Sequence, residues 1–193
     1  MNLPNKLTVM RMICIPVIFI LYFLRQAIGD STLLIIGVLF TLASVTDFFD
    51  GYIARKRNIV TTFGKFMDPL ADKLLVLGTL MILSDLYTGN YLGTQTMWMP
   101  FWIVFVILAR ELIVTSIRLV AVGEGKILHA SKLGKYKTAL TMVTIMYYLF
   151  IMPLDMGVIN IIGIVLISLS VFMTLWSGLD YFIKNKEFIL KEI

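Results

Sequence analysis

The chain has 193 residues, 59% of them hydrophobic, and a formal net charge of +5. Soluble domains are usually about 45–50% apolar, so this excess indicates that lipid is the solvent for most of the surface. The basic residues lack a face with interleaved aromatic side chains, which argues against a nucleic-acid-binding protein. One cysteine and one histidine cannot build a disulfide or a zinc site, so any bound metal must have mainly oxygen ligands.

Hydrophobic runs long enough to cross a bilayer recur along the whole chain. A spanning helix needs about 20 predominantly apolar residues, and six stretches qualify: 6–25, 32–55, 63–86, 97–122, 135–153 and 157–183. The first lacks a small-residue cleavage site, so we expect a retained helix and not a signal peptide. The sequence therefore predicts an all-α polytopic membrane protein with six transmembrane helices, in a single domain covering residues 1–193.

The basic residues predict the orientation of these helices. If the N-terminus is cytoplasmic, every Lys and Arg except Arg25 falls on the cytoplasmic side. Such a bias is the positive-inside signal, so we expect the N-terminus and the basic loops to face the cytoplasm. Arg25 is expected to pair with Asp30 or to extend to lipid headgroups.

Four aspartates lie where the second predicted helix ends and the third begins. Asp47 and Asp50 are three residues apart, and Asp68 and Asp72 are four apart, so each pair shares one helix face. Small residues line the same faces and leave room for a ligand: Gly51, Ala54 and Gly64. The alternative interpretation is a set of simple ion pairs with nearby cations, namely Arg55, Lys56, Arg57, Lys65 and Lys73.

The spacing favours a metal site over simple ion pairs. Four converging carboxylates repel one another unless a cation neutralises them. All-oxygen ligation favours Mg²⁺ or Mn²⁺, with Ca²⁺ as an alternative. Two ions sharing carboxylates would make the two-metal arrangement that acts on phosphate esters, and Arg55 could neutralise phosphate oxygens.

Between Asp47 and Asp72 the sequence reads D-x2-D-G-x2-A-R-x8-G-x3-D-x3-D. This pattern resembles the signature of the CDP-alcohol phosphatidyltransferase family at every fixed position. The resemblance implies that family's fold, a bacterial cell membrane, CDP-diacylglycerol as donor, CMP as product and two divalent metal ions. It also favours a homodimer.

The resemblance further implies a role for each residue. Asp47, Asp50 and Asp68 would hold the metals, with Asp47 and Asp68 bridging both ions, and Asp72 would bind the second metal and accept a proton from the acceptor hydroxyl. The residues implied to contact CDP-diacylglycerol are Gly51, Ala54, Arg55, Thr61, Gly64, Asn5 and Thr8. The alternative interpretation of Asn5 and Thr8 is that they are ordinary helix caps.

Basic residues of the C-terminal half indicate the acceptor. Four cations could form a pocket for an acceptor that carries its own phosphate, such as glycerol-3-phosphate: Arg110, Arg118, Lys135 and Lys137. A structural Glu111–Arg118 ion pair is the competing interpretation, and His129 fits an ordinary interfacial residue. Inositol phosphate or phosphatidylglycerol are alternative acceptors. A divalent-cation transporter is the alternative from another class, but it would place acids near the bilayer midplane, whereas these cluster at one face.

Overall fold

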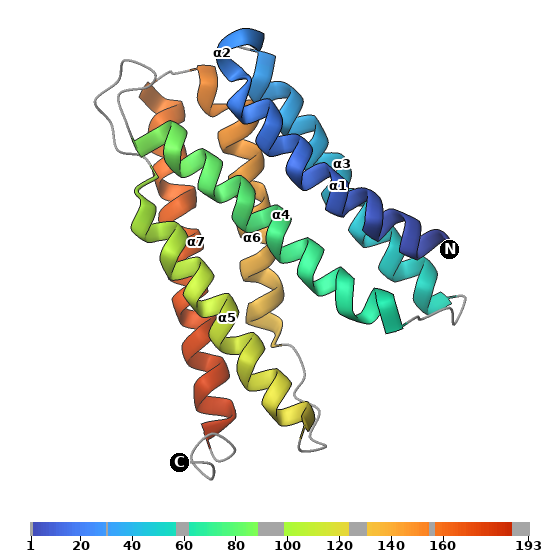
Figure 1. Ribbon diagram of the computed structural model, residues 1–193. Coiled ribbons are helices and arrows are strands. Elements are labelled where there is room, and N and C mark those ends of the chain that lie inside the picture. The colour runs from blue at the N-terminus through green and yellow to red at the C-terminus, as the bar shows by residue number, and fades with distance from the viewer. Residues whose placement is uncertain are drawn as a thin grey trace. The chain divides into compact units, whose positions relative to one another are not determined.

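The computed structural model describes residues 2–29, 31–56, 62–88, 99–123, 131–154 and 157–186, and these contain helices and no strand (Figure 1). Some side chains within the helices lie outside the described part: those of residues 3, 4, 48–56, 62, 63 and 65. The chain forms two compact units. Unit 1 comprises Met1–Leu86 with Ile145–Leu154, and unit 2 comprises Tyr87–Thr144 with Asp155–Ile193.

Six long helices match the six predicted spans, so the all-α prediction is confirmed. They are α1 (Leu3–Phe23), α3 (Ser31–Lys56), α4 (Thr62–Thr88), α5 (Phe101–Gly123), α6 (Lys132–Phe150) and α7 (Gly157–Lys184). Two short elements were not predicted: α2 (Arg25–Ile28) and the 3₁₀ turn η2 (Met152–Leu154). Gly29 ends α2 with φ of 80°, a left-handed conformation that glycine adopts without steric cost.

Three of the described helical segments are long and apolar enough to cross a membrane: Asn5–Phe23, Lys132–Leu154 and Gly157–Lys184. A shorter apolar stretch covers Ser31–Asp47 of α3. α4 and α5 are also long enough to cross a bilayer, and both carry charged residues, including Asp68 and Asp72 on α4 and Arg110 on α5. Charges within membrane helices are costly and usually serve a function. The charged residues of α3, α4 and α5 therefore indicate where functional sites lie.

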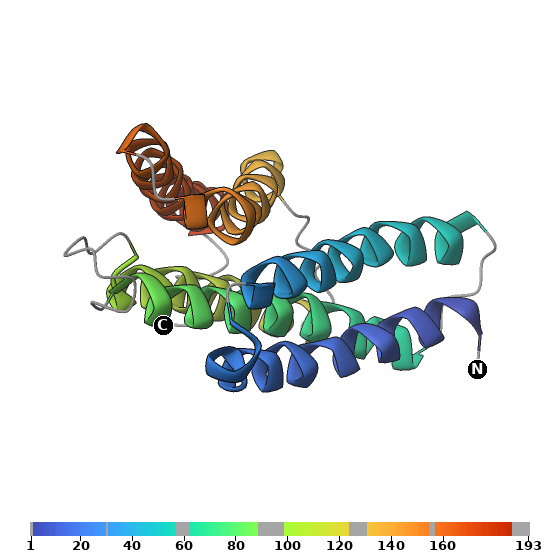
Figure 2. The same ribbon diagram turned by 90° about the horizontal axis from the view of Figure 1, so that it is seen from above.

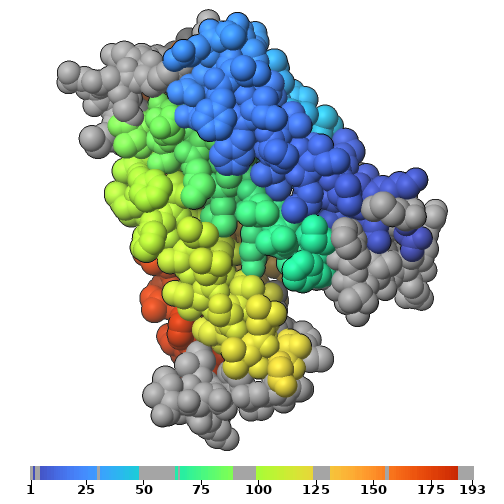
Figure 3. Space-filling view, in the orientation of Figure 1, coloured from blue at the N-terminus to red at the C-terminus, as the bar shows by residue number. Residues whose placement is uncertain are grey.

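In unit 1, α1 and α3 run side by side in opposite directions (Figures 1 and 2). Glycines allow close packing at two points. A Cβ added to Gly37 would come within 2.7 Å of the Phe150 ring, and one added to Gly78 within 2.9 Å of the Phe19 ring. The surface of α1 that Figure 3 shows belongs to a helix with several exposed apolar side chains, such as Ile13, which is 58% exposed. This exposure suits a helix that contacts lipid.

A polar link joins α1 to α4 near the end of α1 that precedes α2. The Tyr22 hydroxyl donates a hydrogen bond to Asp85, and the Arg25 guanidinium lies 3.8 Å from the same carboxylate. Arg25 also lies over the Tyr22 ring, at 4.1 Å from its centroid. The acid beside Arg25 is thus Asp85; Asp30, the partner expected from the sequence, lies outside the described residues.

In unit 2, α5 packs against α7, and buried hydroxyls join α6 to α7. The Thr144 and Ser170 hydroxyls lie 2.8 Å apart. Further along α7, the Thr174 hydroxyl donates to the Ser170 carbonyl, and the Ser177 hydroxyl donates to the Thr174 carbonyl. These contacts satisfy polar groups that neither lipid nor an apolar interior could pair.

Candidate functional site

The first aspartate of the motif, Asp47, meets a cation from a different helix. The Arg11 guanidinium of α1 is fully buried, and its Nη1 lies 2.6 Å from the Asp47 Oδ1. The Asp47 side chain keeps 35% of its exposure. An arginine stays charged in proteins, so its burial requires a counter-charge, and Asp47 provides it. At the same time Asp47 remains accessible to a ligand.

The third aspartate of the motif, Asp68 on α4, is also held by α1. The Thr8 hydroxyl is buried and donates a hydrogen bond to the Asp68 Oδ1 at 2.5 Å. The carboxylates of Asp68 and Asp47 are near enough for their charges to interact. Two carboxylates from different helices repel each other when they are close, and a bound cation removes that repulsion. Carboxylate oxygens are also the hard donors that Mg²⁺ and Mn²⁺ prefer. The donor chemistry of Asp47 and Asp68 is therefore the kind that a divalent cation requires.

The fourth aspartate, Asp72, lies one turn after Asp68 on α4 and is half-buried. Gly64, one turn before Asp68, is buried. The surroundings of the other residues of the predicted metal and donor site lie outside the part of the chain that the structure describes. These residues are Asp50, Gly51, Ala54, Arg55 and Thr61. Among the described side chains, no three acids, histidines or cysteines gather closely enough to hold a metal. The four-aspartate metal site therefore stays a prediction.

The two N-terminal residues predicted to contact the donor have different surroundings. Thr8 is 1% exposed and bonded to Asp68. Asn5, one turn earlier on α1, is partly exposed. Neither is the residue before the helix, which is Asn2. The interpretation of Thr8 and Asn5 as N-terminal caps is therefore wrong.

All four predicted acceptor residues lie in unit 2, and two of them contact the same acid, Glu111. Glu111 Oε1 is 2.9 Å from the Arg110 Nη1 and 2.5 Å from the Lys137 Nζ. Lys137 is 4% exposed. The Arg110 Nη2 also donates to the Ser177 hydroxyl at 3.0 Å. Glu111 thus pairs with Arg110 and Lys137 and not with Arg118, the partner that the sequence suggested.

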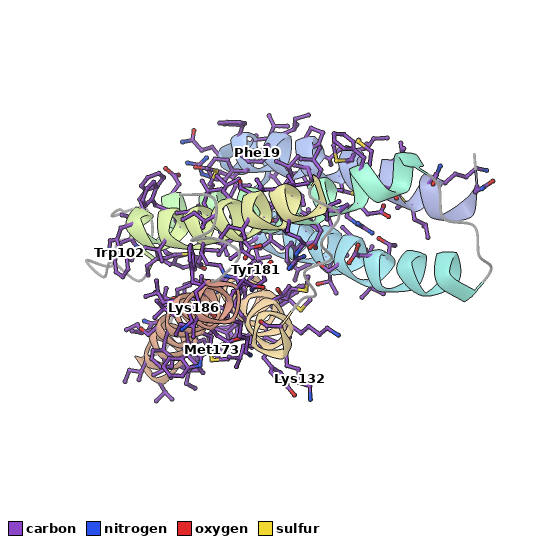
Figure 4. All side chains as sticks on the ribbon, turned by 90° about the horizontal axis from the view of Figure 1, so that it is seen from below. Phe19, Trp102, Lys132, Met173, Tyr181 and Lys186 are labelled. Atoms are coloured by element: carbon purple, nitrogen blue, oxygen red, sulfur yellow. The ribbon has the colours of Figure 1, made fainter. Side chains whose placement is uncertain are left out.

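Arg118 lies against an aromatic side chain of α7. Its guanidinium is 5.9 Å from the centroid of the Tyr181 ring, which Figure 4 labels. Among the described residues, neither the buried Tyr181 hydroxyl nor the buried Nε atoms of Arg118 and Arg110 have a hydrogen-bond partner. Buried donors are normally paired, so unpaired ones point to a missing ligand or water. Lys135, the fourth predicted residue, is exposed.

Several residues of these sites were not predicted from the sequence. The sequence shows Arg11 only as a basic residue at the start of an apolar run, which predicts a cytoplasmic position and no particular partner. Ser177 and Tyr181 carried no signal, since a serine and a tyrosine on an apolar helix are common. Their contacts depend on which helices pack together.

The chain matches the model of the CDP-alcohol phosphatidyltransferase family over residues 1–176. It belongs to that family. A Bacillus subtilis protein named CDP-diacylglycerol–glycerol-3-phosphate 3-phosphatidyltransferase is 40% identical over 96% of each chain. A Rickettsia typhi protein of the same name is 38% identical over 94% of this chain and 95% of its own. A Mycobacterium tuberculosis protein named probable phosphatidylglycerophosphate synthase is 35% identical over 93% of this chain and 79% of its own.

Proposed function

We propose that this member of the family transfers the phosphatidyl group of CDP-diacylglycerol to glycerol-3-phosphate, which yields phosphatidylglycerophosphate and CMP. The observation that carries the proposal is that one helix, α1, contacts both Asp47 and Asp68, two acids from different helices within an unbroken family motif. Full-length relatives that carry the name of this reaction support the choice of substrates. The apolar helices suit a donor whose acyl chains stay in the bilayer.

We further propose that the reaction depends on divalent metal, Mg²⁺ or Mn²⁺, held by Asp47, Asp50, Asp68 and Asp72. When bound, the metal supplies positive charge that stabilises the pyrophosphate oxygens. Asp72 accepts the proton of the acceptor hydroxyl. The hydroxyl oxygen forms a bond to the phosphorus that carries diacylglycerol, the bond from that phosphorus to CMP breaks, and CMP leaves.

Arg110, Lys137 and Arg118 are proposed to bind the acceptor's phosphate. Glu111 neutralises one of the first two charges, so the group keeps a positive excess. The unpaired donors of Arg118, Arg110 and Tyr181 add hydrogen bonds that a phosphate could accept. An acceptor with its own phosphate is therefore favoured over a neutral alcohol. Lys135, exposed at the start of α6, would attract such an anion from solution.

The basic residues support a topology in which the N-terminus and the active site face the cytoplasm. Cysteines placed singly in an otherwise cysteine-free variant, at Lys132 and at Thr94, would test it by labelling from one side of sealed vesicles. The family resemblance also favours a homodimer, which light scattering in detergent would test.

An acceptor panel tests the proposed reaction. Purified protein in detergent is given labelled CDP-diacylglycerol, Mn²⁺ and one acceptor at a time: glycerol-3-phosphate, inositol phosphate or phosphatidylglycerol. We expect CMP release only with glycerol-3-phosphate. Product formation with another acceptor and none with glycerol-3-phosphate would refute the choice of acceptor. Because detergent abolishes any ion gradient, CMP release also separates an enzyme from a cation transporter.

A further inference from the structure

Helix α1 contacts two aspartates of the motif, Asp68 and Asp47. Thr8 and Arg11 are three residues apart and so lie on one face of α1. Each is 1% exposed. Thr8 contacts Asp68 of α4, and Arg11 contacts Asp47 of α3. One helix face thus touches one acid from each half of the motif.

We propose that Thr8 and Arg11 are positioning residues, which fix the carboxylates of Asp68 and Asp47 for metal binding without touching substrate. The inference rests on the metal-dependent function proposed above. It also gives Thr8 a role different from the donor contact that the family resemblance implied.

The geometry of the two contacts supports this role. Both join α1 to the Oδ1 atom of an aspartate, at 2.5 Å for Asp68 and 2.6 Å for Asp47. Neither contact occupies the Oδ2 atom of the acid in question. A side chain held through one oxygen loses rotational freedom, while the second oxygen stays available as a ligand. Outer-shell partners of this kind orient metal-ligating carboxylates.

The charge of Arg11 adds a second effect. Asp47 and Asp68 repel each other, and without a cation that repulsion would drive their side chains apart. The guanidinium of Arg11 is permanently charged and sheltered from solvent. Its charge offsets part of the repulsion between the two carboxylates in the metal-free protein, so they are already close together when metal binds.

The competing explanation is that these contacts only hold helices together. Unit 1 offers a comparison, because Tyr22 and Arg25 of the same helix contact Asp85 of α4 in a similar polar link outside the motif. If Thr8 and Arg11 only joined helices, removing either link would lower stability and leave metal affinity unchanged. If they position ligands, only the Thr8 and Arg11 changes weaken metal binding.

The test measures Mn²⁺ binding to the full-length purified protein by electron paramagnetic resonance of the free ion. We expect Thr8→Val and Arg11→Met to weaken Mn²⁺ affinity by about 10- to 100-fold, the usual effect of losing an outer-shell partner. Thr8→Ser keeps the hydroxyl and should restore most of the affinity. Arg11→Lys keeps the charge but not the planar fork, and should restore part of it.

Two matched variants serve as controls. Thr41→Val removes a hydroxyl that donates within α3 to the Gly37 carbonyl, and Arg25→Met removes the cation near Asp85. Both should bind Mn²⁺ as the unmodified protein does. Thermal unfolding in detergent identifies any variant that fails to fold, and Thr8→Val, the smaller change, keeps the test decisive if Arg11→Met does not fold.

The outcomes separate this inference from the proposed function. If the unmodified protein binds no Mn²⁺ and releases no CMP, the proposed function fails. If it does both, and folded Thr8→Val and Arg11→Met bind Mn²⁺ with unchanged affinity, the positioning role is overturned. A rise in the Mn²⁺ concentration that folded Thr8→Val needs for half-maximal activity would agree with the positioning role.

Discussion

The two units solve the problem of buried charge in opposite ways. In unit 1, two acids, Asp47 and Asp68, are held by one cation and one neutral hydroxyl. In unit 2, two cations, Arg110 and Lys137, share one acid, Glu111. The first group carries an excess of negative charge and the second an excess of positive charge. Because uncompensated charge is costly away from water, each excess agrees with the ligand proposed for its unit: a metal cation for unit 1 and an anion for unit 2.

The largest effect is expected from removing an acid of unit 1. Asp68→Asn abolishes one negative charge and one candidate ligand, so we expect CMP release to fall by about 10³-fold or more. The Thr8 hydroxyl can still donate to the remaining oxygen, so the fold should persist. Enzymatic turnover and circular dichroism measured on the same sample check both points. Near-normal turnover would show that Asp68 is not needed for catalysis. It would also contradict the idea that the negative charge of unit 1 serves to bind a metal.

Removing the shared acid of unit 2 should affect stability first. Glu111→Gln leaves Lys137 and Arg110 without their counter-charge, and breaking such a buried pair typically costs about 3–5 kcal/mol. We expect the lower end of that range, since Glu111 keeps 18% side-chain exposure. Thermal unfolding in detergent measures the loss. Glu111→Gln combined with Lys137→Met should recover part of it, and a variant as stable as the unmodified protein would show that Glu111 is not needed for charge balance.

A conservative change in unit 2 should affect the acceptor alone. Arg118→Lys keeps the charge but loses the planar guanidinium beside Tyr181. We expect KM for glycerol-3-phosphate to rise about tenfold, which corresponds to about 1.4 kcal/mol, with little change in kcat. Steady-state kinetics with Lys132→Ala as control measures it, since Lys132 is exposed at the start of α6 (Figure 4). An unchanged KM would place the acceptor's phosphate elsewhere.

The smallest effect is expected at the other polar link of unit 1. Tyr22→Phe removes the hydroxyl that donates to Asp85. One hydrogen bond contributes about 1 kcal/mol to stability, and Asp85 is 62% exposed, so water can replace it. We expect a small drop in the unfolding temperature and unchanged Mn²⁺ affinity. Weaker Mn²⁺ binding in this variant would mean that α1 influences the metal ligands along its whole length.

The long helices of the fold could be predicted from the sequence, because lipid solvent demands long apolar runs and these runs are visible in it. The aspartate motif could also be recognised from the sequence, because it is defined by the spacing of residues within two consecutive helices. Arg11 shows where such reasoning ends: its charge could be counted, but its contact with Asp47 depends on the packing of α1 against α3. Glu111 teaches the same point. Its heptad neighbour Arg118 was the natural partner on one helix, yet Lys137 reaches it from another.

The row of hydroxyls on α7 restricts how that helix can move. Ser170, Thr174 and Ser177 recur at spacings of four and three residues and are all buried, so they form a single polar stripe along one side of a helix otherwise rich in large apolar side chains. Two of these hydroxyls also contact other helices: Ser170 meets Thr144 of α6, and Ser177 accepts a hydrogen bond from Arg110 of α5. Turning α7 about its long axis would break both contacts. They therefore oppose rotation of α7 and keep Ser177 facing Arg110.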